Sequence, residues 1–335
     1  MNKFVSLFLA AAMVMSFSCC EAKAAPYTLK IGSVVQDDSA TGISLLKYFK
    51  PYVDEKSGGK IVVEVYNNAI LGGDRQLFES LQMNTVQGSM GPISVLASFA
   101  PDFSICDAPF LFKDKKTAYA ALDGEFGAMM TKSLPEKGMR LLGYGENAFR
   151  NISSNSKPVT KLEDMKGMKI RVMESPVYIN TMKALGANPT PMAFNELYTA
   201  LQQGTVDGQD NGVVLTHTAK LYEVLKYYTF TEHCYAANAY VFSEEFLQTL
   251  PADLLKVVED GVKYALDNQR RLNTEMEESL IKEIEKSGVQ VTRLSAEEKA
   301  RWQTATAGVI DSMANVVSKE ILEAAKNVNA KYGNR

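Results

Sequence analysis

The sequence predicts an α/β protein built from two lobes. Short β-prone runs alternate with amphipathic helical runs from Tyr27 onward, the alternation begins again near Arg150, and a long amphipathic helix follows both sets. Such alternation is typical of a mostly parallel sheet with helices on both faces. The 335 residues, 46% of them hydrophobic and 22% charged, are ordinary for a globular protein of two domains.

Residues 1–24 have the pattern of a secretory signal peptide. Met1-Asn-Lys3 is a positive start, Phe4 to Phe17 is a short apolar run, and Ala22-Lys-Ala24 places small residues before a cleavage point that we predict after Ala24. A lipid anchor on Cys19 or Cys20 is the competing hypothesis. Because no later run approaches the ~20 apolar residues of a membrane span, we expect an exported, soluble mature chain.

The first set of elements runs to about residue 144. The pattern predicts strands over 27–35, 60–66, 86–93 and 139–144, and helices over 43–53, 75–83 and 116–132, the second of them capped by Asp74. Gly143 to Ala148 matches the letters G-x-G-x-x-A. Because β-prone residues follow where a dinucleotide site needs a helix to begin, we predict no nucleotide site there.

The second set includes a strand over 169–172 and a helix from Pro176, and a strand over 235–242 then returns to the first lobe. A helix over 253–286 is long enough to span both lobes, and Ser295-Ala-Glu-Glu298 is a capping box for further helices that extend to about residue 330. We therefore predict a signal peptide over 1–24, lobe 1 from 25–147 plus 237–276, and lobe 2 from 148–236 plus 277–335.

Composition and motifs argue against catalysis, metal binding and nucleic-acid binding. The net charge is −3 and no P-loop, G-x-S-x-G, H-E-x-x-H or CxxC motif follows the signal. His217 and His233 are the only histidines, too few for a typical histidine-based metal site. We expect no catalytic residue, metal or cofactor. Cys106 and Cys234 could form a disulfide or remain buried thiols, and the sequence leaves both open.

Arg171 is a lone arginine inside the short strand predicted over 169–172. A guanidinium on a buried strand must find an anion, because an unpaired buried charge is strongly destabilising, and its planar fork matches a carboxylate. The anion is either a carboxylate of the protein, which makes Arg171 a structural salt bridge, or a ligand.

Three long motifs around Arg171 carry a family resemblance: Asp164-Met-Lys-Gly-Met-Lys-Ile-Arg-Val, Gly186-Ala-Asn-Pro-Thr-Pro-Met-Ala-Phe-Asn-Glu-Leu-Tyr-Thr-Ala-Leu-Gln and Val206-Asp-Gly-Gln-Asp-Asn. Together with Leu71-Gly-Gly-Asp-Arg and Asp107-Ala-Pro-Phe-Leu-Phe, they resemble extracytoplasmic solute-binding proteins of tripartite ATP-independent periplasmic (TRAP) transporters. The resemblance covers nearly the whole mature chain. It implies the two-lobed periplasmic binding protein fold, type II-like, with hinge strands and a lobe-spanning C-terminal helix.

The resemblance also implies the binding residues. In that family a strand arginine binds the carboxylate of the ligand, and the matching residue is Arg171. Arg150 matches a second family arginine and Asn211 the asparagine that ends the last motif, and both are expected at the acid end of the ligand. Phe194 matches an aromatic that packs on the ligand, and Asp74 matches a polar contact from lobe 1.

The ligand is expected to be an organic acid, but two cues about its class conflict. Val34-Val-Gln-Asp-Asp38 looks like the branch of the family that binds C4-dicarboxylates, whereas the segments around Glu146 and Arg171 resemble branches that bind sugar acids. We favour a hexuronate such as glucuronate or galacturonate, because Asp74, Glu146 and Asp210 could accept its hydroxyl groups and would repel a second carboxylate.

The expected role is that of a non-enzymatic, monomeric receptor in the periplasm. The resemblance implies the small and large membrane subunits of a TRAP permease as partners and a small organic acid as ligand, with no role for nucleic acid. A secreted enzyme acting on a sugar acid and a ligand-binding protein for a membrane sensor are the other two hypotheses.

Overall fold

The computed structural model describes residues 27–333, so the predicted signal peptide and the alternative anchors Cys19 and Cys20 lie outside the described residues. Nine strands join in one sheet with the order β2-β1-β3-β8-β4-β7-β5-β6, and β9 pairs with β8. The strands are β1 Tyr27–Gly32, β2 Ile61–Tyr66, β3 Gly88–Pro92, β4 Met139–Ser154, β5 Lys169–Val172, β6 Asn188–Pro191, β7 Gly208–Asn211, β8 Tyr227–Ser243 and β9 Gln290–Arg293.

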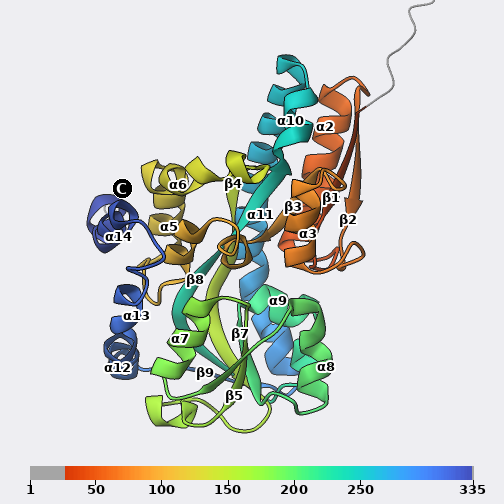
Figure 1. Ribbon diagram of the computed structural model, residues 1–335. Helices are drawn as coiled ribbons and strands as arrows, with labels where there is room; N and C mark the ends of the chain where they lie inside the picture. Colours follow the sequence, from red (N-terminus) through yellow and green to blue (C-terminus); the bar gives the residue numbers. More distant parts are fainter. Residues whose placement is uncertain (1–26, 334–335) are drawn as a thin grey trace, which may run out of the picture.

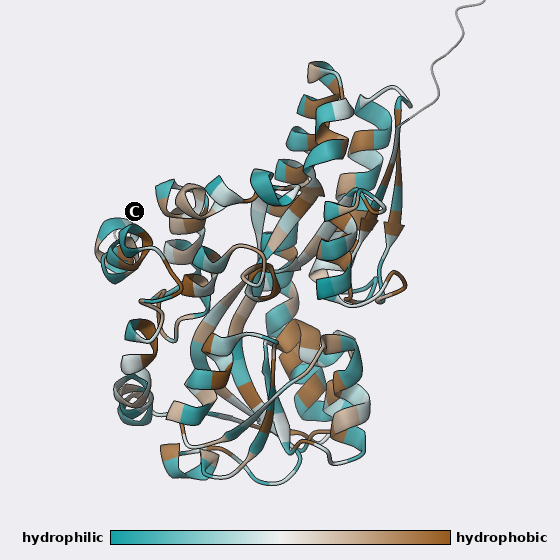
Figure 2. Cartoon of the chain, viewed as in Figure 1, coloured by the Kyte–Doolittle hydropathy of each residue, from teal (hydrophilic) through white to brown (hydrophobic). Residues whose placement is uncertain are grey.

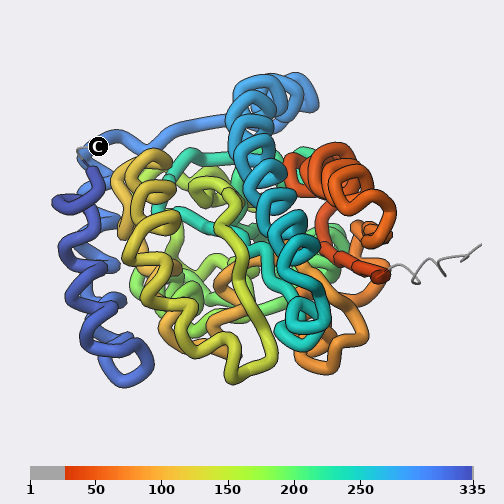
Figure 3. Tube along the Cα trace, turned by 90° about the horizontal axis from the view of Figure 1, so that it is seen from above, coloured from red at the N-terminus to blue at the C-terminus, as the bar shows by residue number. Residues whose placement is uncertain are grey.

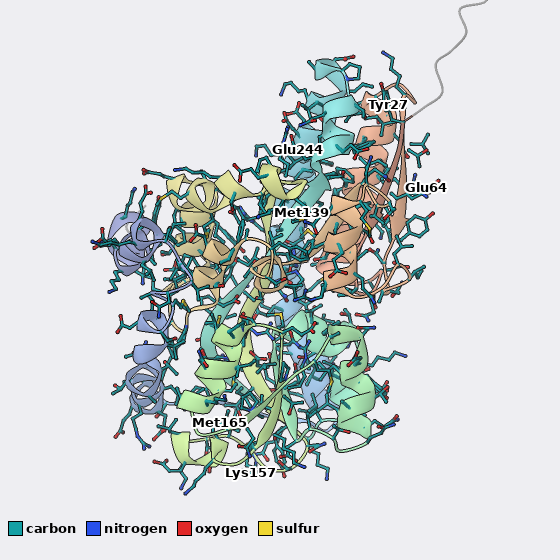
Figure 4. The ribbon with its side chains drawn as sticks, in the orientation of Figure 1. Tyr27, Glu64, Met139, Lys157, Met165 and Glu244 are labelled. Atoms are coloured by element: carbon teal, nitrogen blue, oxygen red, sulfur yellow. The ribbon has the colours of Figure 1, made fainter. Side chains whose placement is uncertain are left out.

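The molecule has two lobes, joined by β4 and β8 (Figure 1). Lobe 1 holds β1, β2 and β3, and lobe 2 holds β5, β6, β7 and β9. Figure 4 labels Met139, the first residue of β4, in lobe 1, and Lys157, shortly after its end, at the far tip of lobe 2. β4 and β8 pair antiparallel along almost their whole length, so this ladder is the connection between the lobes.

The sheet differs from the predicted, mostly parallel one in its centre. Pairs β1–β2, β1–β3, β5–β6 and β5–β7 are parallel, as strand–helix alternation requires. β4 and β8 are instead antiparallel to each other, and they join the two parallel parts. The sequence pattern predicted a strand only for the lobe-1 half of each of these long strands and indicated residues 149–154 of β4 as β-prone, because Gly and polar residues interrupt the apolar pattern.

The helices are α1 Ala40–Ile43, α2 Lys50–Lys56, α3 Asp74–Gln82, α4 Ile93–Leu96, α5 Lys115–Leu122, α6 Glu125–Met130, α7 Pro176–Ala184, α8 Leu197–Gln202, α9 Val213–Thr218, α10 Glu244–Thr249, α11 Ala252–Lys286, α12 Ala296–Thr306, α13 Gly308–Asp311, α14 Lys319–Lys326 and α15 Val328–Tyr332. A π-helical segment, Ser44–Phe49, joins α1 to α2. Hydrophilic and hydrophobic residues alternate around the turns of the outer helices, as expected for helices with one buried face (Figure 2).

The long helix α11 was predicted almost to the residue, over 253–286. In Figure 3 it runs as one continuous helix along a side of the molecule. Its first half packs in the lobe-1 core through Val258, Val262 and Ala265, and Ile284 near its end packs on Tyr228 and Val289. One rigid element therefore contacts both lobes.

Two helix predictions were wrong in detail. The helix predicted over 116–132 is broken into α5 and α6, because Gly124 interrupts it and begins the second helix as its N-cap. Asp74 was predicted to cap α3, but Gly73 is the N-cap and Asp74 is the first helical residue, which leaves its carboxylate free to point elsewhere.

The C-terminal helices contact both parts of the molecule. α12 packs against α7 and β8 in lobe 2, and its Trp302 lies in the lobe-2 core. α14 and α15 pack against α6 and α5, where Ile321 and Val328 join the same apolar cluster as Phe126. We keep the boundaries 25–147 plus 237–276 and 148–236 plus 277–335 as a proposal about which segments move together.

Across residues 27–333, no helix has both the length and the apolar composition that crossing a membrane requires. Cys106 and Cys234 are free and buried, 1% and 0% exposed respectively. Burial raises the pKa of both thiols, so each is held in its unreactive protonated form.

We predict that protein lacking residues 1–24 contains two thiols that react only after unfolding. A thiol-specific disulfide reagent should label little of the native protein and both cysteines in denaturant, without prior reduction. Absence of labelling in denaturant would show that Cys106 and Cys234 are joined in a disulfide instead.

Candidate functional site

A cleft lies between the lobes where the parallel strands of both lobes end. β1 and β3 lead into it from lobe 1, and β5, β6 and β7 lead into it from lobe 2, which is where open α/β sheets hold ligands. It encloses about 570 Å³ of space free of protein atoms, part of it open to solvent. The lining residues are Val34, Val35, Thr41, Asp74, Met90, Gly91, Pro92, Val95, Asn147, Arg171, Met173, Glu174, Met192, Ala193, Phe194, Asn211, Leu215 and Asn238.

Arg171 reaches the cleft because of strand alternation. Its neighbours Ile170 and Val172 lie in the lobe-2 core, so the side chain between them points to the opposite face of β5. It is 1% exposed, and its Nε and Nη2 donate to the carbonyl of Met192 at 3.0 and 2.7 Å. Within residues 27–333 its Nη1 is buried and has no hydrogen-bond partner.

The charge of Arg171 is not neutralised by a contacting carboxylate within the described chain. Burial and then the nearby charge of Arg150 lower its pKa to about 10, against smaller opposing effects of Asp210, Asp74 and Glu174. A buried guanidinium with a free donor can hold an anion of matching geometry. The structural salt bridge that was the alternative for Arg171 is not formed among the described residues.

Arg150 and Asp210 form the salt bridge instead. The Nε of Arg150 lies 2.6 Å from Oδ2 of Asp210, its Nη2 lies 3.0 Å from Oδ1, and both side chains are fully buried. Burial would raise the pKa of Asp210, but the charge and hydrogen bonds of Arg150 hold it at about 2. His233 approaches the same carboxylate, with Nε2 3.4 Å from Oδ2.

This pairing changes two predicted roles. Asp210 was expected to accept ligand hydroxyls, but it is 0% exposed, does not line the cleft, and is committed to Arg150. Arg150 does not line the cleft either. Its Nη1 is buried and has no hydrogen-bond partner among the described residues.

Glu146 is the third predicted residue that lies outside the cleft lining. Its side chain is fully buried, its Oε1 lies 2.8 Å from Nζ of Lys115, and its Oε2 accepts a hydrogen bond from Tyr119. Glu146 therefore faces away from the cleft, and the neighbouring Asn147 lines it instead.

Asp74 projects into the cleft from lobe 1, opposite Arg171. The carboxylate lies against Gly91, where a Cβ would come within 3.0 Å of Oδ1, so a glycine makes room for it. Oδ1 is buried and lacks a hydrogen-bond partner in the described part of the chain. Burial raises the pKa of Asp74 to about 7, with Arg171 opposing and Glu174 adding to this effect.

One hydroxyl, three amides and one acid complete the polar lining: Thr41, Asn147, Asn211, Asn238 and Glu174. Only Asn211 was predicted. Asn147 comes from a bulge in β4, Asn238 from β8, and Glu174 from the turn between β5 and α7. Asn147 and Glu174 lie in sequence segments that resemble the sugar-acid branches, so that resemblance was the available signal.

Apolar side chains from both lobes meet beside the cleft. Phe194 and Leu215 of lobe 2 pack with Val34, Val35 and Leu77 of lobe 1 in one small cluster. The Phe194 ring centroid is 5.9 Å from Cζ of Arg171. The two lobes are therefore in contact across the cleft, as in a closed binding protein.

Between residues 27 and 333, no group of three or more His, Cys, Asp or Glu side chains is arranged to hold a metal ion. His217 contacts Glu283 on α11, with Nε2 2.9 Å from Oε2, and it does not line the cleft.

We predict that removing the counterion of Arg150 lowers the unfolding free energy, whereas removing the charge of Arg171 does not. Asp210→Asn leaves Arg150 buried without its counterion and should cost about 3–5 kcal/mol of unfolding free energy. Arg171→Met removes an uncompensated buried charge and should leave that free energy unchanged within about 1 kcal/mol, or raise it. Urea denaturation measures both, and a loss of several kcal/mol in Arg171→Met would mean that Arg171 is structural.

We predict that Asp74 makes the stability of the ligand-free protein fall with rising pH. Its pKa is raised from 3.8 to about 7 on folding, so between these values the folded state binds more protons than the unfolded state. The unfolding free energy should decrease across that window, by at most about 1.4 kcal/mol per pH unit. Asp107, whose pKa burial raises to about 6, acts in the same direction.

Comparison with Asp74→Asn isolates this effect, because Asp107 is present in both proteins. The unfolding free energy of wild type should fall relative to that of Asp74→Asn from pH 4 to 7, so that wild type minus variant becomes steadily more negative. If plots of unfolding free energy against pH stay parallel for the two proteins over that range, Asp74 is ionised throughout in the folded protein.

Comparison with known proteins places this geometry in a family. The profile of bacterial extracellular solute-binding protein family 7, DctP, matches residues 31–316. The C4-dicarboxylate-binding periplasmic protein DctP of Rhodobacter capsulatus is 34% identical over 314 residues, which are 92% of this chain and 93% of that protein.

Solved structures agree with this result. The sugar acid binding protein DctPAm of Advenella mimigardefordensis, in complex with galactonate, has a TM-score of 0.89 and 34% identity, covering 92% of this chain and 99% of that one. A TRAP periplasmic solute binding protein of Sulfitobacter sp. with bound β-D-galacturonate has a TM-score of 0.85 and 28% identity, covering 92% of this chain and 100% of that one. The chain therefore belongs to bacterial extracellular solute-binding protein family 7, the solute-binding proteins of TRAP transporters.

Proposed function

We propose that this protein is the periplasmic receptor of a TRAP transporter and that it closes on a sugar acid, a hexuronate such as glucuronate or galacturonate. One observation carries the proposal. Arg171 lines the cleft with a buried Nη1 that has no partner in the described residues, so the site lacks one anion. A ligand carboxylate supplies that anion in the geometry that a guanidinium fork prefers.

The rest of the lining favours a hydroxylated ligand with a single carboxylate. Asp74 and Glu174 can accept hydrogen bonds from hydroxyl groups, and the amides of Asn147, Asn211 and Asn238 can both donate and accept. A second ligand carboxylate would meet like charge at the buried Asp74 when that group is ionised, and would also approach the exposed acid Glu174. The preference was first based on Asp74, Glu146 and Asp210; of these only Asp74 lines the cleft, and Glu174 takes the place of the other two.

Closure follows from contacts on both lobes. Asp74 belongs to lobe 1 and Arg171 to lobe 2, so a ligand that bonds to both stabilises the closed arrangement. We further propose that the closed receptor, a monomer exported by the signal peptide over residues 1–24, delivers its ligand to the small and large membrane subunits of the permease. It performs no chemistry on the acid.

A C4-dicarboxylate is the alternative ligand. The relative from Rhodobacter capsulatus, named for C4-dicarboxylate binding, supports it. The buried carboxylate of Asp74 opposes it unless Asp74 is protonated. Affinity for a dicarboxylate should then increase as the pH falls below about 7, whereas affinity for a hexuronate depends less on pH.

We predict that calorimetry and thermal shift will find binding of hexuronates in a screen that includes aldonates and C4-dicarboxylates, since a ligand of the folded form raises its apparent stability. Arg171→Met should weaken this binding by about 2–5 kcal/mol, the effect of truncating one partner of a buried charge pair. Arg271→Met is the matched control, because Arg271 is half-exposed on α11 and pairs with Glu275 away from the cleft.

Two results would contradict the proposal. Equal binding by wild type and Arg171→Met would remove Arg171 from the site. If NMR shows that wild type converts the acid to a new compound and that Arg171→Met does not, the protein is an enzyme.

A further inference from the structure

Glu146 is a fully buried acid that does not line the cleft, and two residues of α5 hold its side chain. Lys115, near the start of α5, places Nζ 2.8 Å from Oε1, and Tyr119 of the same helix donates to Oε2. The same Lys115 Nζ also lies 2.7 Å from Oε2 of Glu277 on α11. A charge this deep is costly unless its partners stay in place, so the position of Glu146 is tightly defined.

The backbone of Glu146 is held as firmly as its side chain. Its N–H donates to Oε1 of Gln269 at 2.9 Å, and its carbonyl accepts from Nε2 of Gln269 at 2.6 Å. Gln269 is 0% exposed and lies on α11, the helix that contacts both lobes. The side-chain amide of Gln269 therefore satisfies both the N–H and the carbonyl of Glu146, the residue immediately before an irregularity in the β-ladder.

The break is a β-bulge, and Asn147 is its extra residue. Glu146 pairs with Ala237 and Ala148 pairs with Ala236, so β4 advances by two residues while β8 advances by one. Ala148 has φ +93°, a conformation that an alanine rarely adopts and that the surroundings must maintain.

The bulge shapes the cleft on two sides. Asn147 lines the cleft directly. Gly212, the residue after the lining residue Asn211, packs on the bulge so closely that a Cβ there would lie 2.8 Å from Cβ of Ala148 and 3.1 Å from the carbonyl of Asn147. A shift of the bulge would therefore move one lining amide and press on the segment that carries another.

We propose that Glu146 is a positioning residue of the binding site: clamped by Lys115 and Gln269, it holds the strained bulge that presents Asn147 to the ligand. This inference rests on the proposed receptor function for its effect on affinity. The clamp itself does not depend on which acid is bound.

Two matched substitutions test the proposal, and each removes one of the two carboxylates that pair with Lys115. Glu146→Gln keeps the size of the side chain and leaves Lys115 paired with Glu277, and Glu277→Gln removes the other carboxylate from Lys115 without contacting the bulge. Hydrogen exchange of the ligand-free proteins should show at least about tenfold weaker protection over residues 146–149 in Glu146→Gln. Protection there in Glu277→Gln should match wild type, and equal protection in all three proteins would overturn the clamp.

The affinity measurement uses D-galacturonate and a double-mutant cycle with Asn147→Ala. Glu146→Gln should weaken binding roughly 10- to 100-fold in the wild-type background, within the range for coupled neighbours, and less than about threefold in the Asn147→Ala background. Equal losses in both backgrounds would show that Glu146 acts on global stability and not through Asn147.

Two further results keep the outcomes distinct. If Glu146→Gln fails to fold, Gln269→Leu should give the same pattern, because it removes the backbone clamp without changing charge, and additive losses in its cycle would overturn the proposal. If wild type binds neither D-galacturonate nor any other acid of the screen, the receptor proposal fails, while the exchange measurement still decides whether Glu146 holds the bulge.

Discussion

The site depends on two neighbouring buried guanidinium groups, of which only Arg150 has a carboxylate partner among the described residues. Arg150 takes both oxygens of Asp210, and the nearby Arg171 is left with the Met192 carbonyl and a free Nη1. The repulsion between the two arginines appears in the pKa of Arg171, which burial and Arg150 lower to about 10. An incoming carboxylate would relieve both the desolvation and the repulsion, so the protein stores unfavourable energy that a suitable ligand releases.

Two contacts beside the cleft join the lobes by different means. In the first, Ser94 of lobe 1 and Ser175 of lobe 2 both donate to the buried carboxylate of Asp107. The second is apolar, through Phe194 of lobe 2 and its lobe-1 neighbours. Polar bonds with defined partners favour one arrangement, whereas apolar contacts separate without leaving unpaired groups, so we infer that the Phe194 contact separates when the cleft opens.

The sequence predicted the parts of the fold that local pattern determines. β5 and α11 follow from short-range alternation and helical periodicity, and both were correct, as was the helix beginning at Pro176. Four predicted site residues, Arg171, Asn211, Phe194 and Asp74, are brought together in one cleft.

The misplaced residues depend on pairings between distant segments. Asp210 meets Arg150 because β4 and β7 pair antiparallel with Ile152 opposite Asp210, and no local pattern encodes that register. Asn147 reaches the cleft through a bulge, which shifts the side that each following residue faces. Glu146 is drawn away by Lys115, 31 positions earlier in the chain, for the same reason.

A crystal structure of the protein with bound hexuronate tests the central claim most directly. The account predicts a ligand carboxylate oxygen within about 2.7–3.2 Å of Nη1 of Arg171, with Asp210 still paired to Arg150. A closed cleft in which the ligand carboxylate lies elsewhere, while an acid of the protein neutralises Arg171, would contradict it.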